Sequence, residues 1–204
     1  RDASGYFRIN RILKGQNWSK SLRSPLAEHG KNVKEGDYIL SVDGKSVKDV
    51  SDLYELLVGK AEKQVVLKIN STPGEQGSRE LTVVPIADEH NLYYYNWVQK
   101  NIEKVDKATN GRVGYLHIPN MGPDGLNEFV KHFYPQLIKE AIIIDDRGNG
   151  GGNVSPHIIE RLRREPVQVV VVRHGAPSFE PVEQIVGPNI ALIDEYSASD
   201  GDIF

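Results

Sequence analysis

The chain has 204 residues, which is enough for one large domain or two small ones with ordinary hydrophobic cores. Its 25 basic and 28 acidic residues give a net charge of -3, so no overall field attracts nucleic acid or a membrane surface. The absence of cysteine excludes disulfides and thiolate chemistry. No apolar run approaches the ~20 residues of a membrane-spanning helix.

Neither a metal site nor a cofactor is expected. The six histidines are scattered and show no H-E-x-x-H or other close ligand spacing. The chain begins with Arg1 rather than Met, so we expect it to be a piece of a longer protein.

The first segment, residues 1–87, alternates short strands with turn signals. An alternating pattern predicts a half-buried strand at its start, and a Pro at the first helical position predicts a one-turn helix. Ser51 is expected to cap a longer helix that Gly59 ends. The expected elements are strands Tyr6–Ile12, Tyr38–Val42, Gln64–Asn70 and Arg79–Val84, and the one-turn helix Ser24–His29.

Residues 88–110 are predicted to form a bridge that includes a polar helix. The aromatic run Leu92–Val98 is expected to pack the flanking domains together, with ligand stacking as the alternative. Glu103 and Lys107 lie four apart, a helical pair that contributes a few tenths of a kcal/mol.

The second segment, residues 111–204, alternates strands and helices. This order predicts a mostly parallel α/β layer whose ligand site lies at the carboxyl ends of the strands. The expected strands are Arg112–Ile118, Ala141–Asp145, Val167–Arg173 and Asn189–Asp194; the expected helices are Gly125–Lys139, Asn153–Arg164 and one that begins near Ser199.

Two turns at these carboxyl ends have the residues of a nucleophile and an oxyanion site. Ser199 follows a buried strand, and its N–H and that of Asp200 would point toward an oxyanion at a helix start. The glycines Gly150–Gly152 follow another strand and leave further N–H groups free. Phosphate binding and purely structural turns are the alternatives. The loop lacks the Lys-Ser/Thr of a P-loop and the G-x-G-x-x-G spacing of a dinucleotide site.

The first segment resembles a PDZ domain in two stretches, Ser24–Ala27 and Val33–Val47. The resemblance implies a groove, between a strand and a helix, that takes the carboxyl end of a peptide by strand addition. Ser4-Gly5-Tyr6-Phe7 occupies the place of the carboxylate-binding loop, and the groove residues are expected to be Gly5, Tyr6, Phe7 and Ile9. The alternative is a vestigial groove, or one that the chain itself fills.

With both segments in order, the chain is similar to the tricorn proteases, within the wider group of C-terminal processing serine peptidases. The residues that carry this resemblance are Gly111–Pro119, Asp146–Gly152 and Glu195–Asp202. It implies a mixed α/β and β-rich fold, in which a PDZ-like domain precedes a partial ClpP/crotonase-like core with mostly parallel strands. This core would be cut shortly after the turn that carries the nucleophile.

The resemblance also implies roles for individual residues. Ser199 would be the nucleophile, and the oxyanion hole would combine the N–H of Asp200 with that of Gly151 or, as second choice, Gly152. Ser197 would shape the turn. Asp202 would support the helix or select the free amino end of a substrate.

The general base is missing from the residues that this resemblance matches. In tricorn-like enzymes a His before the PDZ domain and a Glu well after the nucleophile complete the site, and related processing peptidases use a downstream Lys. We therefore expect the chain alone to be catalytically silent. His117 is expected to be a packed structural residue.

The resemblance further implies peptide substrates, a homo-oligomeric and ring-like parent protein, and a cytoplasmic location. Exposed apolar surface near Ile190–Phe204 is expected to promote self-association. Two alternatives stay open: a non-catalytic PDZ scaffold or binding module on the same fold, and a folded fragment with no activity of its own.

Overall fold

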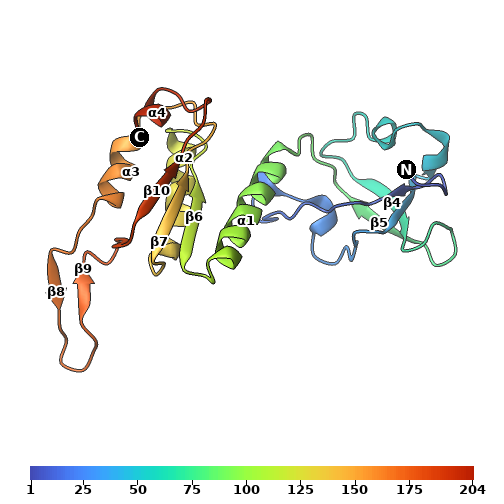
Figure 1. Ribbon diagram of the computed structural model, residues 1–204. Coiled ribbons are helices and arrows are strands. Elements are labelled where there is room, and N and C mark those ends of the chain that lie inside the picture. The colour runs from blue at the N-terminus through green and yellow to red at the C-terminus, as the bar shows by residue number, and fades with distance from the viewer. The chain divides into compact units, whose positions relative to one another are not determined.

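The computed structural model describes residues 1–204, which divide into a first unit, Arg1–Trp97, and a second unit, Val98–Phe204. The first unit contains an antiparallel sheet, and the second contains a parallel sheet (Figure 1). The expected mixed α/β fold class is confirmed.

The first unit is built on a five-stranded antiparallel sheet. Its strand order is β1-β2-β4-β5, and the short strand β3 pairs with β2. The strands are β1 (Phe7–Arg8), β2 (Tyr38–Val42), β3 (Lys45–Ser46), β4 (Val65–Asn70) and β5 (Arg79–Val83). Single-turn helices connect them: η1 (Lys20–Leu22), η2 (Pro25–Ala27), η3 (Val47–Asp49) and η4 (Leu53–Leu56).

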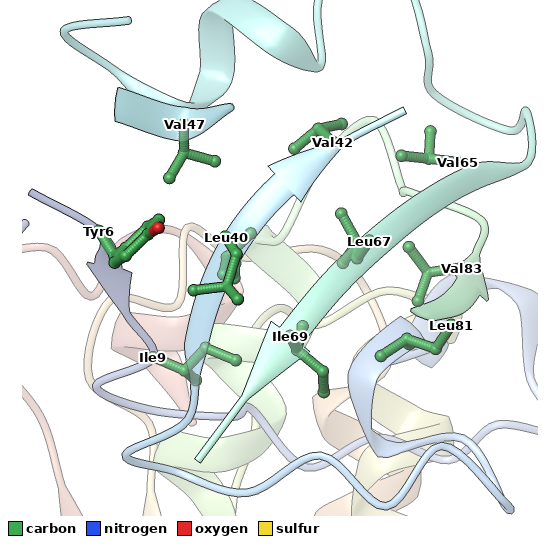
Figure 2. Close-up of a cluster of buried hydrophobic side chains, with 11 residues drawn as sticks. Tyr6, Ile9, Leu40, Val42, Val47, Val65, Leu67, Ile69, Leu81 and Val83 are labelled. Carbon is green, nitrogen blue, oxygen red and sulfur yellow. The ribbon is translucent and has the colours of Figure 1, made fainter. Parts of the chain in front are cut away.

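The core of the first unit follows from strand alternation. Val65, Leu67 and Ile69 of β4 point to one face, because side chains two apart share a face of a strand. Val42 and Val47 are fully buried beside them (Figure 2). Each such side chain contributes roughly 2 kcal/mol by leaving water.

Two elements of the first unit differ from the expectation. Strand β1 has two residues rather than the seven of Tyr6–Ile12, because the chain leaves the regular ladder at Ile9, which exchanges hydrogen bonds with the backbone of Asp37 and Gly36. The helix near residue 53 is a single turn of 3-10 helix. Its cap is Asp52, which forms a capping box with Glu55, so the expected cap at Ser51 was wrong.

Helix α1 (His90–Ala108) starts in the first unit and ends in the second. Within the first unit, the amide of Asn96 donates to the Lys14 carbonyl and accepts from its N–H. This polar helix occupies most of the predicted bridge.

The second unit is built on three parallel strands in the order β10-β7-β6 (Figure 1). They are β6 (Val113–His117), β7 (Ala141–Asp145) and β10 (Asn189–Leu192). His117 and Leu192 both lie in register with Asp145, so all three carboxyl ends meet at one edge of the sheet.

Helices α2 (Pro123–Phe133) and α3 (Ser155–Leu162) contribute to the core of the second unit. Phe129 and Phe133 of α2 are fully buried, and their rings stack with centroids 4.7 Å apart. The α-helix ends earlier than expected, at the short 3-10 turn η5 (Tyr134–Gln136), because Pro135 cannot donate the next helical hydrogen bond.

The expected strand Val167–Arg173 is not part of the parallel layer. Residues Gln168–Val170 form β8, which pairs antiparallel with β9 (Ser178–Glu180) as a separate two-stranded sheet. A hairpin needs only a short loop, whereas a parallel partner requires a long crossover. None of the helices has the length and apolarity that crossing a bilayer requires.

Candidate active site

The candidate site lies at the carboxyl edge of the parallel sheet. The loop after β7 contains the glycines 150–152, and the loop after β10 leads to Ser199 and helix α4 (Asp200–Ile203). The sheet register brings these loops to one edge, because β7 and β10 are adjacent parallel strands.

Ser199 has an uncommon backbone conformation. It immediately precedes α4 with φ 53° and ψ −125°, although it is not a glycine. Such a conformation costs about 1–3 kcal/mol and persists only when the surroundings fix it. The side chain makes no capping hydrogen bond, and the residue is exposed. The hydroxyl is therefore presented to solvent on a tight turn.

The glycine loop packs directly on this turn. A Cβ atom at Gly151 would lie 2.7 Å from the Ser199 Cβ and 2.8 Å from the Ala198 carbonyl oxygen. A Cβ atom at Gly152 would lie 2.0 Å from the carbonyl oxygen of Met121. Both positions also have positive φ, so only glycine fits this close approach.

The backbone N–H groups of the two loops are not all available. The N–H of Gly151 donates to the side-chain oxygen of Asn149 at 2.9 Å. The N–H groups of Gly152, Ser199 and Asp200 have no acceptor within the chain. The expected donors at Gly152 and Asp200 are therefore unused in this conformation, whereas that at Gly151 has an internal partner.

The carboxylate of Asp200 binds the first residue of α3. It accepts from the Ser155 N–H at 3.1 Å and from the Ser155 hydroxyl at 2.5 Å. Sequence reasoning assigned only the N–H of Asp200 and missed Ser155. The two residues are 45 positions apart, and no local pattern signals that they pair.

Two buried carboxyl groups lie side by side at the end of β7. Asp145 accepts a hydrogen bond from the Tyr115 hydroxyl at 2.6 Å and two from the Arg147 guanidinium. Burial disfavours its charge, but these donors outweigh burial, and the pKa of Asp145 is lowered. Burial, followed by the hydrogen bond to Asp145 and the charge of that carboxylate, raises the pKa of the Tyr115 hydroxyl.

Asp146 has the opposite electrostatic environment. It is fully buried, one of its oxygens accepts from Asn149, and the other has no hydrogen-bond partner. Burial and the neighbouring carboxylates of Asp145, Asp200 and Asp194 raise the pKa of Asp146 to about 7. A neutral carboxyl group is therefore substantially populated here at neutral pH.

The remaining residues singled out from the sequence lie around this centre. His117 is 6% exposed, its Nε2 is 3.1 Å from the Arg147 carbonyl oxygen, and burial lowers its pKa. The Ser197 hydroxyl donates to the carbonyl oxygen of Asp146 at 3.0 Å and so ties the two loops together. Asp202 is exposed, and its N–H donates to the Ser199 carbonyl.

No group of three or more His, Asp or Glu side chains is arranged to hold a metal ion.

The first unit contains a separate cavity of about 460 Å³. Phe7 and Ile9 line it from the β1 segment, and Leu53 and Leu57 line it from the η4 segment. The strand β1 lies at the edge of its sheet, so one side of its backbone is unpaired by the sheet. This is the geometry that strand addition requires.

The other two predicted groove residues do not line this cavity. Tyr6 lies in the core at 9% exposure, with the Lys48 ammonium 4.1 Å from its ring centroid. Gly5 has φ +81°, and its N–H closes a turn onto the Asp2 carbonyl.

Comparison with known proteins matches each half of the chain to a family. Residues 1–88 match the tricorn protease PDZ domain, and residues 112–204 match peptidase family S41. The chain thus has the tricorn protease PDZ and S41 peptidase domains. The resemblance inferred from the sequence is confirmed.

Relatives match over nearly the whole chain. A tricorn protease of Thermoplasma volcanium is 36% identical over 99% of this chain and 19% of its own length. The tricorn protease homolog 1 of Streptomyces coelicolor is 36% identical over 100% of this chain and 19% of its own length. A crystal structure of the tricorn protease superposes with a TM-score of 0.85 and 33% identity, over 97% of this chain and 19% of that one. The chain therefore spans about a fifth of the length of these relatives.

Proposed function

We propose that this chain is the section of a tricorn-type serine peptidase that carries the nucleophile, Ser199. The observation that carries this proposal is the Ser199 turn itself. An exposed hydroxyl sits on a strained turn at a helix start, beside a glycine loop that closely approaches it. Membership of peptidase family S41 over residues 112–204 supports a serine peptidase.

In this mechanism the Ser199 hydroxyl attacks a peptide carbonyl and forms an acyl-enzyme. The new bond joins the serine Oγ to the carbonyl carbon, and the hydroxyl proton passes to a base while the amine leaves with a proton. Of the three unused donors, the N–H groups of Asp200 and Gly152 are the two that we assign to the oxyanion. Each such donor contributes about 10²–10³ in rate.

The base belongs outside residues 1–204 in this proposal. The Ser199 hydroxyl makes no hydrogen bond within the chain. A serine without a positioned base loses several orders of magnitude in rate, because base and nucleophile act as a unit. The chain alone is therefore silent toward short peptides.

A fluorophosphonate tests this function in the product of the complete open reading frame that encodes the chain. Mass spectrometry should locate the label on Ser199, and Ser199→Ala should abolish it. A folded, unlabelled complete protein would instead favour a non-catalytic scaffold or binding module.

We also propose that the cavity of the first unit binds the carboxyl end of a peptide. Its apolar lining by Phe7, Ile9 and Leu57 suits an apolar last side chain, and the edge of β1 suits an added strand. Fluorescence polarisation with a free-acid peptide and its amide tests this. Binding of the acid alone supports the proposal, and equal binding of both contradicts it.

The assembly and location complete the proposal. From the resemblance to the tricorn proteases we further propose a cytoplasmic location and a homo-oligomeric, ring-like assembly. The word protease in the names of the relatives supports only the proposal that the protein acts on peptides. Native mass spectrometry of the complete protein and fractionation of its cells test these two statements separately. A monomer, or recovery outside the cytoplasm, would contradict them.

A further inference from the structure

Asn149 joins three segments at the carboxyl edge of the sheet. Its side-chain nitrogen donates to the Asp146 carboxyl at 2.7 Å and to the Ile118 carbonyl at 3.2 Å. Its side-chain oxygen accepts from the Gly151 N–H at 2.9 Å. Its backbone carbonyl accepts from the Ala198 N–H at 2.9 Å. The residue has no exposed surface, so water replaces none of these bonds.

Helix α4 also packs on this residue. A Cβ atom at Gly201 would lie 2.6 Å from the backbone oxygen of Asn149 and 2.9 Å from its side-chain oxygen. The start of the helix that follows Ser199 is therefore held against Asn149 without an intervening side chain. Moving Asn149 would move both the glycine loop and the Ser199 turn.

We propose that Asn149 is a positioning residue that sets the separation between the glycine loop and the Ser199 turn. This inference rests on the proposed function, because it concerns the two halves of the oxyanion site. Asn149 does not touch the reacting atoms. It acts through Gly151 on one side and through Ala198 on the other.

An asparagine is the residue type that this place requires. Only a side-chain amide offers two donors and an acceptor that satisfy Asp146, Ile118 and Gly151 at once. An aspartate would lose both donors and add a further carboxyl group to those already near Asp146. An alanine would leave the part-buried N–H of Gly151 and the buried carboxyl group of Asp146 without these partners.

Hydrogen exchange in the wild-type chain provides the first test. The N–H groups of Gly151 and Ala198 should exchange about tenfold or more slowly than that of Gly152, which has no acceptor, after correction for sequence effects. Equal exchange of Gly151 and Gly152 would overturn the proposal without any variant.

The variant Asn149→Ala should speed the exchange of Gly151 and Ala198 by about tenfold and shift the amide resonance of Asp200. The matched control is Gln136→Ala, which removes another amide with three hydrogen bonds in the same unit. Changes at Ala198 no larger than those in the control would contradict the positioning role.

Labelling of Ser199 in the complete protein adds a functional measurement. Asn149→Ala should lower the maximal rate of fluorophosphonate labelling by about 10²-fold while the concentration for half-maximal rate stays unchanged. A rate equal to wild type would overturn the inference. If the wild type takes no label, the proposed function fails, and the exchange experiment still decides the role of Asn149.

Discussion

The Asp200 carboxylate holds Ser155 by two hydrogen bonds, one from its N–H and one from its hydroxyl. This contact ties the residue after the nucleophile to the first residue of α3. The negative charge also lies at a helix N-terminus, where unpaired N–H groups and the helix dipole favour it. The backbone of Asp200, whose N–H is an oxyanion donor in the proposal, is thereby fixed through its own side chain.

Asp200→Ala should therefore destabilise the second unit by about 1–3 kcal/mol, because a buried hydroxyl and an N–H lose a charged acceptor. Urea unfolding of the chain measures this free energy. Asp202→Ala is the matched control, since Asp202 is exposed and its side chain has no partner. Equal losses in the two variants would contradict the proposed contact.

Gly151→Ala should destabilise the chain and distort the Ser199 turn, because its Cβ would lie 2.7 Å from the Ser199 Cβ. Gly148→Ala is the control: this glycine also has positive φ, but a Cβ there meets nothing within 4 Å. The control should lose only about 1 kcal/mol of backbone strain. Amide spectra should show displacement of Ser199 and Asp200 in the first variant alone.

The raised pKa of Asp146 makes stability depend on pH with a defined sign. The unfolded residue ionises near its ordinary value of 3.8, and the folded one near 7. Between about pH 4 and 7 only the folded state keeps the proton on Asp146. The contribution of Asp146 to the free energy of unfolding therefore falls as the pH rises through this range, and it is constant above pH 7.

Asp146→Asn should remove this falling limb from the curve of unfolding free energy against pH. Asp194→Asn should instead remove a contribution to stability that rises with pH. The hydrogen bond from the Gly148 N–H is the largest cause that lowers the pKa of Asp194, so the stabilising contribution of Asp194 is present above pH 4 and is lost in acid. An unchanged limb in Asp146→Asn would contradict the assignment.

Tyr115→Phe should cost about 1–2 kcal/mol of stability, because it removes the hydroxyl that donates to the buried Asp145 at 2.6 Å. Asn101 would also lose its acceptor, since its amide donates to the same hydroxyl at 3.0 Å. Thermal unfolding measures the loss, with Tyr196→Phe as the comparison, because Tyr196 is a tyrosine of the same unit and is 69% exposed. Identical melting curves would show that the hydroxyl is dispensable.

Local pattern was sufficient for much of the fold. The buried run Ala141–Asp145 is a strand with the expected bounds, and Pro25 begins a helical turn as predicted. Glycines and a serine at strand ends also located the candidate site at the carboxyl edge. These signals depend only on residues that are close in the sequence, so they can be recognised without knowledge of the tertiary contacts.

What the sequence could not supply depends on long-range partners. The strand near Val167 pairs with β9 instead of extending the parallel layer, and periodicity does not specify which strand is the partner. Asn149 and Ser155 were assigned no role. The partner of Ser155 is Asp200, in another loop, and Asn149 joins its own loop to Ile118 and Ala198, which are distant in the sequence. The roles of Ser199, Gly152 and Asp202 stay predictions.

Peptide hydrolysis by the product of the complete open reading frame tests the central claim, that Ser199 is the nucleophile. Ser199→Ala should lower kcat by at least about 10⁴-fold. Ser197→Ala, two residues away, should lower it far less, because the Ser197 hydroxyl is engaged with the Asp146 carbonyl. Hydrolysis that survives in Ser199→Ala at the wild-type rate would contradict the account.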